Sequence, residues 1–172
     1  MHTAKDIYIK STHEAIIELL EEKIDQTSKR IEGMIKQKES LNIEYQNLQT
    51  IPAIGKETAV ILLRHLTDKN FETANKFVAF AGLSPKIEQS GTSVNKKGRL
   101  SRYGHRQLKR ALFMPALVAY RMNAFPQLVR NLEAAKKPKM IIIVALMQKL
   151  AKIAFYIHKS KKPFDKARHQ TV

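Results

Sequence analysis

Apolar residues recur every seven positions along the first third of the chain. The two seam positions of this repeat are occupied by Ile17, Ile24, Ile31, Lys38 and Tyr45, and by Leu20, Thr27, Met34, Leu41 and Leu48. A seven-residue spacing between polar flanks is typical of a coiled coil. We therefore predict one coiled-coil helix over residues 12–50, capped at Ser11 or Thr12, with residues 1–11 as a leader. A long amphipathic helix folded back on the rest of the chain fits the same pattern.

Shorter helical repeats follow residue 50. Pro52 ends the long helix and Gly55 opens another. Apolar residues at spacings of three and four predict further helices from 71 to 82, from 105 past Pro115, over 125–135 and over 139–158. The predicted fold class is mainly α: the long N-terminal coiled-coil helix, then a compact helical domain over 51–158 with a basic loop, then a frayed basic tail over 159–172.

The turn before the second helix has the form of half a helix-hairpin-helix. In that element, backbone N–H groups at a helix start contact a DNA phosphate without reading sequence. Gly55 and Lys56 would make this contact here. Ala53 stands where such a turn usually has a glycine, and alanine tolerates a positive φ poorly. Phosphate contact and a plain helical turn both stay open.

Charge is distributed unevenly along the chain. There are 31 Lys and Arg against 15 Asp and Glu, a formal net charge of +16, and residues 1–50 hold only 7 of the basic residues but 9 of the acidic ones. The densest positive stretch runs from Lys86 to Arg110, with eight basic residues, three glycines and Tyr103 against the single acid Glu88. Such a segment can approach phosphates closely and offers a ring for stacking, which favours a nucleic acid as the partner.

Several classes of site are excluded by composition. The chain has no cysteine, which rules out disulfides and Cys-ligated zinc, and its six histidines show no metal-ligand spacing. The longest apolar run, Met140 to Met147, is well short of the ~18 residues that span a bilayer. No signal peptide precedes residue 30. We therefore expect a soluble cytoplasmic protein with no metal site of its own and no membrane partner.

An ordered series of motifs resembles a known family. The series is PAIGKETA at 52–59, AFAGLSP at 79–85, SG at 90–91 and GRLSRYGHRQLKRAL at 98–112. It resembles the C-terminal domain of the DEDD-type insertion-sequence transposases, which include the pilin-gene invertases and the bridge-RNA-guided recombinases. In that family a helical coil precedes this domain, as it does here. Ala53, His105 and Pro115 depart from the family's usual residues.

The resemblance implies DNA strand exchange at a composite site. Ser90 matches the family's serine, which attacks a DNA phosphodiester and holds the strand as a phosphoserine ester. Lys96, Lys97, Arg99 and Arg102 would neutralise charge on the phosphate oxygens. The family's RuvC-like nuclease domain supplies four acidic residues for a divalent metal, Mg²⁺. Residues 1–10 leave no room for that domain, so we expect no cofactor in this chain and no catalytic competence by itself.

The leading prediction is a DNA transposition or site-specific recombination domain that binds DNA and dimerises, or assembles further, through its coil. A structured guide RNA as a second partner is left open. A non-catalytic nucleic-acid-binding dimerisation module is the alternative, and a structural dimer whose charge serves solubility is a third. The residues predicted to contact DNA or RNA are Gly55, Lys56, Gly91, Lys96, Lys97, Arg99, Arg102, Tyr103, His105, Arg106, Lys109 and Arg110.

Overall fold

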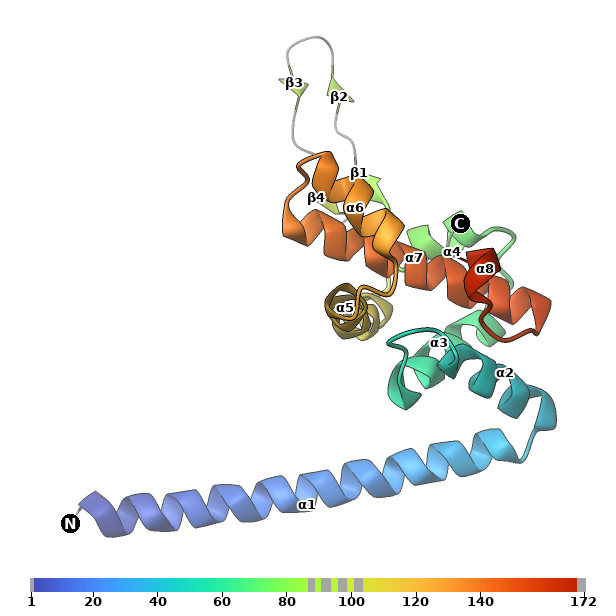
Figure 1. Ribbon diagram of the computed structural model, residues 1–172. Coiled ribbons are helices and arrows are strands. Elements are labelled where there is room, and N and C mark those ends of the chain that lie inside the picture. Colours follow the sequence, from blue (N-terminus) through green and yellow to red (C-terminus); the bar gives the residue numbers. More distant parts are fainter. Residues whose placement is uncertain (1, 87–88, 91–93, 96–98, 101–103, 170–172) are drawn as a thin grey trace. The chain divides into compact units, whose positions relative to one another are not determined.

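The computed structural model describes residues 2–86, 89–90, 94–95, 99–100 and 104–169, and it forms two compact units, residues 1–42 and 43–172 (Figure 1). The predicted mainly α fold class is confirmed, because the strands in the described part of the chain are only two residues long. In chain order the elements are α1 (His2–Lys36), α2 (Glu39–Gln49), α3 (Lys56–Asp68), α4 (Ala74–Phe80), β1 (Pro85–Lys86), β2 (Gln89–Ser90), β3 (Val94–Asn95), β4 (Arg99–Leu100), α5 (Arg106–Arg121), α6 (Pro126–Ala134), α7 (Lys139–Ser160) and α8 (Lys166–His169).

α1 is a single helix of 35 residues, about 50 Å long at its usual rise. It begins at His2, well before the expected start at residue 12. The expected N-cap was wrong, because the hydroxyls of Ser11 and Thr12 donate to the carbonyl of Tyr8, one turn back within the helix. Such back-bonding lets hydroxyl residues sit inside a helix.

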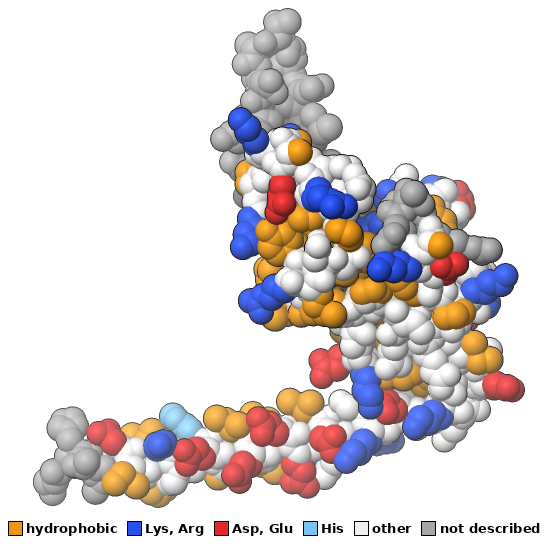
Figure 2. Space-filling model, in the orientation of Figure 1, with side chains coloured by type: hydrophobic (Ala, Val, Ile, Leu, Met, Phe, Trp, Pro, Cys, Tyr) orange, Lys and Arg blue, Asp and Glu red, His pale blue; other side chains and the backbone are white. Residues whose placement is uncertain are grey.

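The predicted apolar seam is exposed along α1, where Figure 2 shows hydrophobic side chains at the surface. The seam residues Ile17, Leu20, Ile24, Ile31 and Met34 are 37% to 62% exposed. A helix that leaves this much apolar surface uncovered gains stability when a partner covers it. Pairing of α1 as a coiled coil stays a prediction.

The single helix expected over residues 12–50 is interrupted at Gln37 and Lys38. The N–H of Lys38 donates to the carbonyl of Ile35 at 3.1 Å, a tight turn that ends the α-helical pattern. Tyr45 and Leu48 continue the seven-residue spacing but are 5% and 0% exposed, in the core of the second unit. The prediction of one continuous helix was therefore wrong, because the last positions of the repeat pack into the core of the second unit and do not extend the exposed seam of α1.

α7 is the central helix of the second unit. α3, α4, α5 and α6 all pack against it, and half of its 22 residues are buried. By length and composition alone it is apolar enough to cross a membrane, but 61% of its most apolar window is buried inside the unit. Burial on several sides requires apolar residues around most of a helix, which accounts for this composition.

A buried polar cluster holds α2 against the end of α7. Glu44 is 7% exposed, its Oε2 lies 2.7 Å from Nδ1 of His158, and its Oε1 accepts a hydrogen bond from the ammonium of Lys161. The amide of Asn47 donates to the carbonyl of Lys161. Farther on, the N–H of Phe164 donates to the hydroxyl of Thr50 at 2.7 Å. The start of the tail, which we expected to be frayed, is therefore tied to the helical domain.

The turn between α2 and α3 adopts the conformation that its sequence disfavours. Ala53 has a φ of 67°, in the left-handed region, where a Cβ is costly by about 1 kcal/mol. The N–H of Ile54 donates to the carbonyl of Ile51 at 3.1 Å, which closes the turn. Ile51 and Ile54 are both buried, so their packing compensates for the unfavourable φ. The missing glycine has therefore not changed the hand of the backbone at this position.

Candidate nucleic-acid interface

The basic segment between α4 and α5 contains two short antiparallel ladders. β1 pairs with β4, placing Lys86 opposite Arg99, and β2 pairs with β3, placing Ser90 opposite Val94. Figure 1 draws β2 and β3 beyond β1 and β4. The two short ladders of a hairpin thus lie within the segment predicted as a basic loop, and the backbone of Ser90 belongs to the second ladder. Five other predicted contact residues lie outside the described residues: Gly91, Lys96, Lys97, Arg102 and Tyr103.

The chain leaves and re-enters the helical domain where two glycines touch. Gly82 and Gly104 have φ angles of 70° and 128°. A Cβ added at Gly104 would lie 2.2 Å from Cα and 2.4 Å from N of Gly82, far closer than two such atoms can approach. Only glycine permits this contact, so it fixes the base of the hairpin segment.

Two hydrogen bonds secure the same junction to the surrounding helices. The N–H of His105 donates to the carbonyl of Phe80 at 2.8 Å, joining the start of α5 to the end of α4. The side-chain amide of Gln148 on α7 donates to the carbonyl of Leu83 at 2.6 Å. Leu83 is fully buried. The hairpin segment therefore begins from backbone that three helices hold in place.

The first turns of α5 carry three of the predicted cations, Arg106, Lys109 and Arg110. His105 is the N-cap, and Arg106 and Arg110 are exposed one turn apart, hence on one face of the helix. Lys109 is half-buried on a different face. The first turn of α5 contains no acidic residue. This arrangement concentrates positive charge at a helix start, which favours a polyanion.

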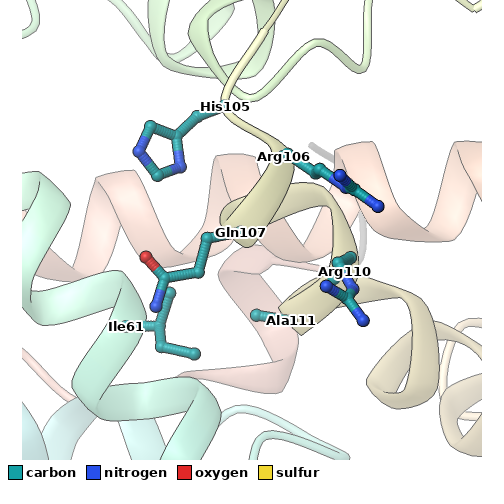
Figure 3. Close-up of a pocket in the computed structure, with 6 residues that line it drawn as sticks. All are labelled: Ile61, His105, Arg106, Gln107, Arg110 and Ala111. Carbon is teal, nitrogen blue, oxygen red and sulfur yellow. The ribbon is translucent and has the colours of Figure 1, made fainter.

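An open hollow of about 640 Å³ lies beside these arginines (Figure 3). In the view of Figure 3 the arginines lie on one side of α5, while His105, Gln107 and Ile61 lie on the other. The residues that line the hollow are Ile61, His105, Arg106, Gln107, Arg110 and Ala111. The sequence did not predict Ile61, Gln107 or Ala111 as site residues, because they bear no charge. The one signal in the sequence is that Gln107 and Ala111 lie one helical turn apart, each next to an arginine, and so share a face of α5.

A cluster of rings lies next to the hollow. The rings of His65 on α3 and His105 are 4.1 Å apart between centroids, and Phe80 lies 5.5 Å from His105. Nε2 of His65 and Nδ1 of His105 are buried and have no hydrogen-bond partner in the described part of the chain. Burial, followed by the charges of His105 and Arg64, lowers the pKa of His65 below its usual value. A hydrogen bond with the side chain of Gln107 and the negative charge of Asp68 oppose this shift without cancelling it. The fold therefore favours a neutral imidazole at His65.

The start of α3 bears the other two predicted phosphate contacts. Gly55 is its N-cap in an extended conformation, with no side-chain cap, and exposed Lys56 is the first helical residue. Ile61, which lines the hollow, follows on the same helix. Helix α3 thus connects the turn predicted to contact phosphate, at Gly55, with the hollow beside α5. Phosphate contact at Gly55 and Lys56 stays a prediction.

The residues that the structure describes do not suit the metal that the family resemblance implies. No three His, Asp or Glu side chains gather into a metal-binding group in the part of the chain that the structure describes. Divalent magnesium is usually bound through one or two carboxylates, and the region of α5 described above is basic. No step through a metal is assigned to these residues.

Comparison with known proteins identifies relatives. Residues 45–130 match the family model described as Transposase IS116/IS110/IS902 family. Over 97% of its length the chain is 36% identical to the pilin gene-inverting proteins of Moraxella lacunata and Moraxella bovis, and it covers 53% of each. It is also 41% identical over 80 residues to an uncharacterized insertion element IS110 protein of Streptomyces coelicolor, covering 46% of this chain and 19% of that protein. The chain therefore spans about half the length of the pilin gene-inverting proteins.

The glycine contact yields a stability prediction. Gly104→Ala places a Cβ against the backbone of Gly82 and an alanine at φ 128°, and we expect it to lower the free energy of unfolding by about 3 kcal/mol. Gly55→Ala is the matched control, because a Cβ there meets no atom within 4 Å. Urea unfolding of both variants measures the difference. Equal stability of the two variants would contradict the close approach.

The histidine cluster yields a pH prediction. Because the pKa of His65 is lowered in the fold, the unfolded chain binds more protons below about pH 6.5, so the free energy of unfolding falls as the pH drops through that value. Desolvation also lowers the pKa of half-buried His158, which acts in the same direction. His65→Phe should therefore reduce the loss of thermal stability on acidification but not abolish it. His13→Phe, at an exposed site of α1, is the matched control, and an unchanged pH profile for His65→Phe would refute the role of His65.

Proposed function

Because the chain belongs to the Transposase IS116/IS110/IS902 family, we propose that it is the DNA-binding and strand-transfer part of a recombinase, with Ser90 as the nucleophile. Two relatives that match 97% of the chain are named for inverting a pilin gene, which is a recombination of DNA. The observation that best supports DNA as the partner is the start of α5, where exposed Arg106 and Arg110 stand beside an open hollow with no acidic lining. A cytoplasmic location follows from this proposal.

The proposed reaction of Ser90 is a transesterification, in which no group is oxidised or reduced. Its Oγ forms a bond to the phosphorus of a DNA phosphodiester while the bond from phosphorus to one sugar oxygen breaks. The sugar oxygen leaves as an alcohol with the proton that the serine loses. In the reverse reaction a different sugar hydroxyl attacks the phosphoserine ester and rejoins the strands. The ester conserves the energy of the original phosphodiester, so no further energy source is needed. The hairpin ladder of β2 and β3 supports the proposal, because it holds the backbone on which Ser90 lies in an extended form.

We propose two partners besides DNA for the intact enzyme. A RuvC-like nuclease domain would hold Mg²⁺ through its own acidic residues, and such a metal would activate the attacking group and stabilise charge on the phosphate. A second copy of this chain would cover the exposed apolar seam of α1. A structured guide RNA remains a third candidate, for which the basic charge of residues 51–172 is the supporting observation.

Salt dependence tests the DNA-binding part of the proposal. We expect the affinity for duplex DNA to fall steeply with salt, with a slope of log K against log salt of about −0.9 per phosphate neutralised. The double variant Arg106→Gln/Arg110→Gln should reduce that slope by about 1 per arginine. Arg121→Gln/Arg130→Gln removes the same charge from exposed sites outside the hollow and is the matched control. Weak binding that is independent of salt would instead favour a structural dimer.

A covalent adduct tests the role of Ser90. A chimera in which this chain replaces the matching segment of the Moraxella bovis relative supplies the rest of that protein. With Mg²⁺ and pilin gene DNA we expect a denaturant-resistant protein–DNA adduct that Ser90→Ala abolishes and the control Ser84→Ala retains. An undiminished adduct in Ser90→Ala would remove Ser90 from the role. Salt-sensitive binding with no adduct in any variant would favour the non-catalytic binding module.

A further inference from the structure

The hollow beside α5 has two chemically different sides. Arg106 and Arg110 are four residues apart and share one face of the helix, and Gln107 and Ala111 share the next face, about 100° around the axis. Ile61 of α3 also lines the hollow and lies next to Gln107, on this second side of α5 (Figure 3). One side therefore offers two guanidinium groups, and the other offers aliphatic surface with one amide.

Each side suits a different part of a nucleotide. Guanidinium groups pair with phosphate oxygens through charge-assisted hydrogen bonds. The aliphatic side chains of Ile61 and Ala111 offer no hydrogen bond to a phosphate, but covering them with the flat face of a base removes apolar surface from water and so favours binding. The side chain of Gln107 is exposed, and its amide, which also hydrogen-bonds to the ring of His65, carries both a donor and an acceptor, the combination that reads the edge of a base. The hollow, of about 640 Å³, is open to solvent, so a base can reach this lining from outside.

We propose that this hollow binds one unpaired nucleotide of the DNA, with its base against Ile61 and Ala111 and its phosphates on Arg106 and Arg110. The inference rests on the proposed function and names the form of DNA that this site takes. In an intact duplex the base faces are stacked and the base edges are paired, so only the phosphates could use the site. Strand exchange requires base pairs at the crossover to open, which releases such nucleotides. The absence of any acidic side chain from the lining fits the negative charge of the ligand.

Three short duplexes of identical sequence test the proposal on the whole chain. One is fully paired, one carries a single unpaired nucleotide, and one carries an abasic sugar at that position. At one fixed salt concentration we expect the base-bearing bulge to bind about tenfold more tightly than the abasic bulge, the size of one stacking contact. Equal affinity for the two bulges would overturn the inference. The proposed function would still stand if binding of the paired duplex remained salt-sensitive.

Two variants locate the preference in the hollow. Ala111→Leu fills the space and Gln107→Leu removes the amide, and each should bring the ratio of the two bulge affinities close to one. Gln127→Leu makes the same change on the exposed surface of α6 and should keep the tenfold ratio. Two variants are used because a larger side chain at Ala111 can disturb the packing of α3 on α5. A preference that persisted in both pocket variants would place the base elsewhere and overturn the assignment.

A matched RNA arm identifies the source of the nucleotide. The same bulge in an RNA duplex is measured under the same conditions, again against its abasic counterpart. We expect the DNA bulge to show the larger ratio. A larger ratio for RNA would overturn the assignment to DNA and indicate a guide strand as the ligand of this hollow.

Discussion

The contact between the backbones of Gly82 and Gly104 is the constraint on which the candidate site depends. It brings the end of α4 and the start of α5 together, so that the segment from 83 to 103 must leave and return at one place. Buried Leu83, held by Gln148, and the hydrogen bond from His105 to Phe80 add directional contacts to this steric one. Since buried backbone groups are costly when unpaired, these bonds make the junction a fixed base for the hairpin.

The same junction connects the two chemical roles of the proposed enzyme. His105 is both the residue after Gly104 and the N-cap of α5, so the backbone that ends the hairpin segment also sets the start of the helix with Arg106 and Arg110. Its ring packs against His65 and Phe80, which ties this helix start to α3 and α4. The cations proposed to bind phosphates and the strand that carries Ser90, the proposed nucleophile, thus share one origin, as positioning for strand transfer requires.

Periodicity predicted much of the fold from the sequence, and the reasons for its failures are local. Apolar residues such as Leu108, Leu112 and Phe77 repeat at helical spacing because they face α7, which makes their helices visible without a structure. The break at Lys38 was missed, because Tyr45 and Leu48 keep the seven-residue spacing while packing into a different core. The early start of α1 was missed because hydroxyl residues that usually cap helices are also tolerated inside them.

The candidate site was only partly predictable, because charge is visible in a sequence and complementarity is not. Arg106 and Arg110 follow from the density of cations, whereas Gln107, Ala111 and Ile61 become significant only when α3 and α5 pack together. Electrostatic attraction to phosphates is strong but nearly indifferent to sequence and to pairing. Any discrimination between paired and unpaired DNA must therefore come from uncharged residues beside the cations. In this chain the uncharged residues beside the cations come from two helices, and the packing of α3 on α5 creates the hollow that they line.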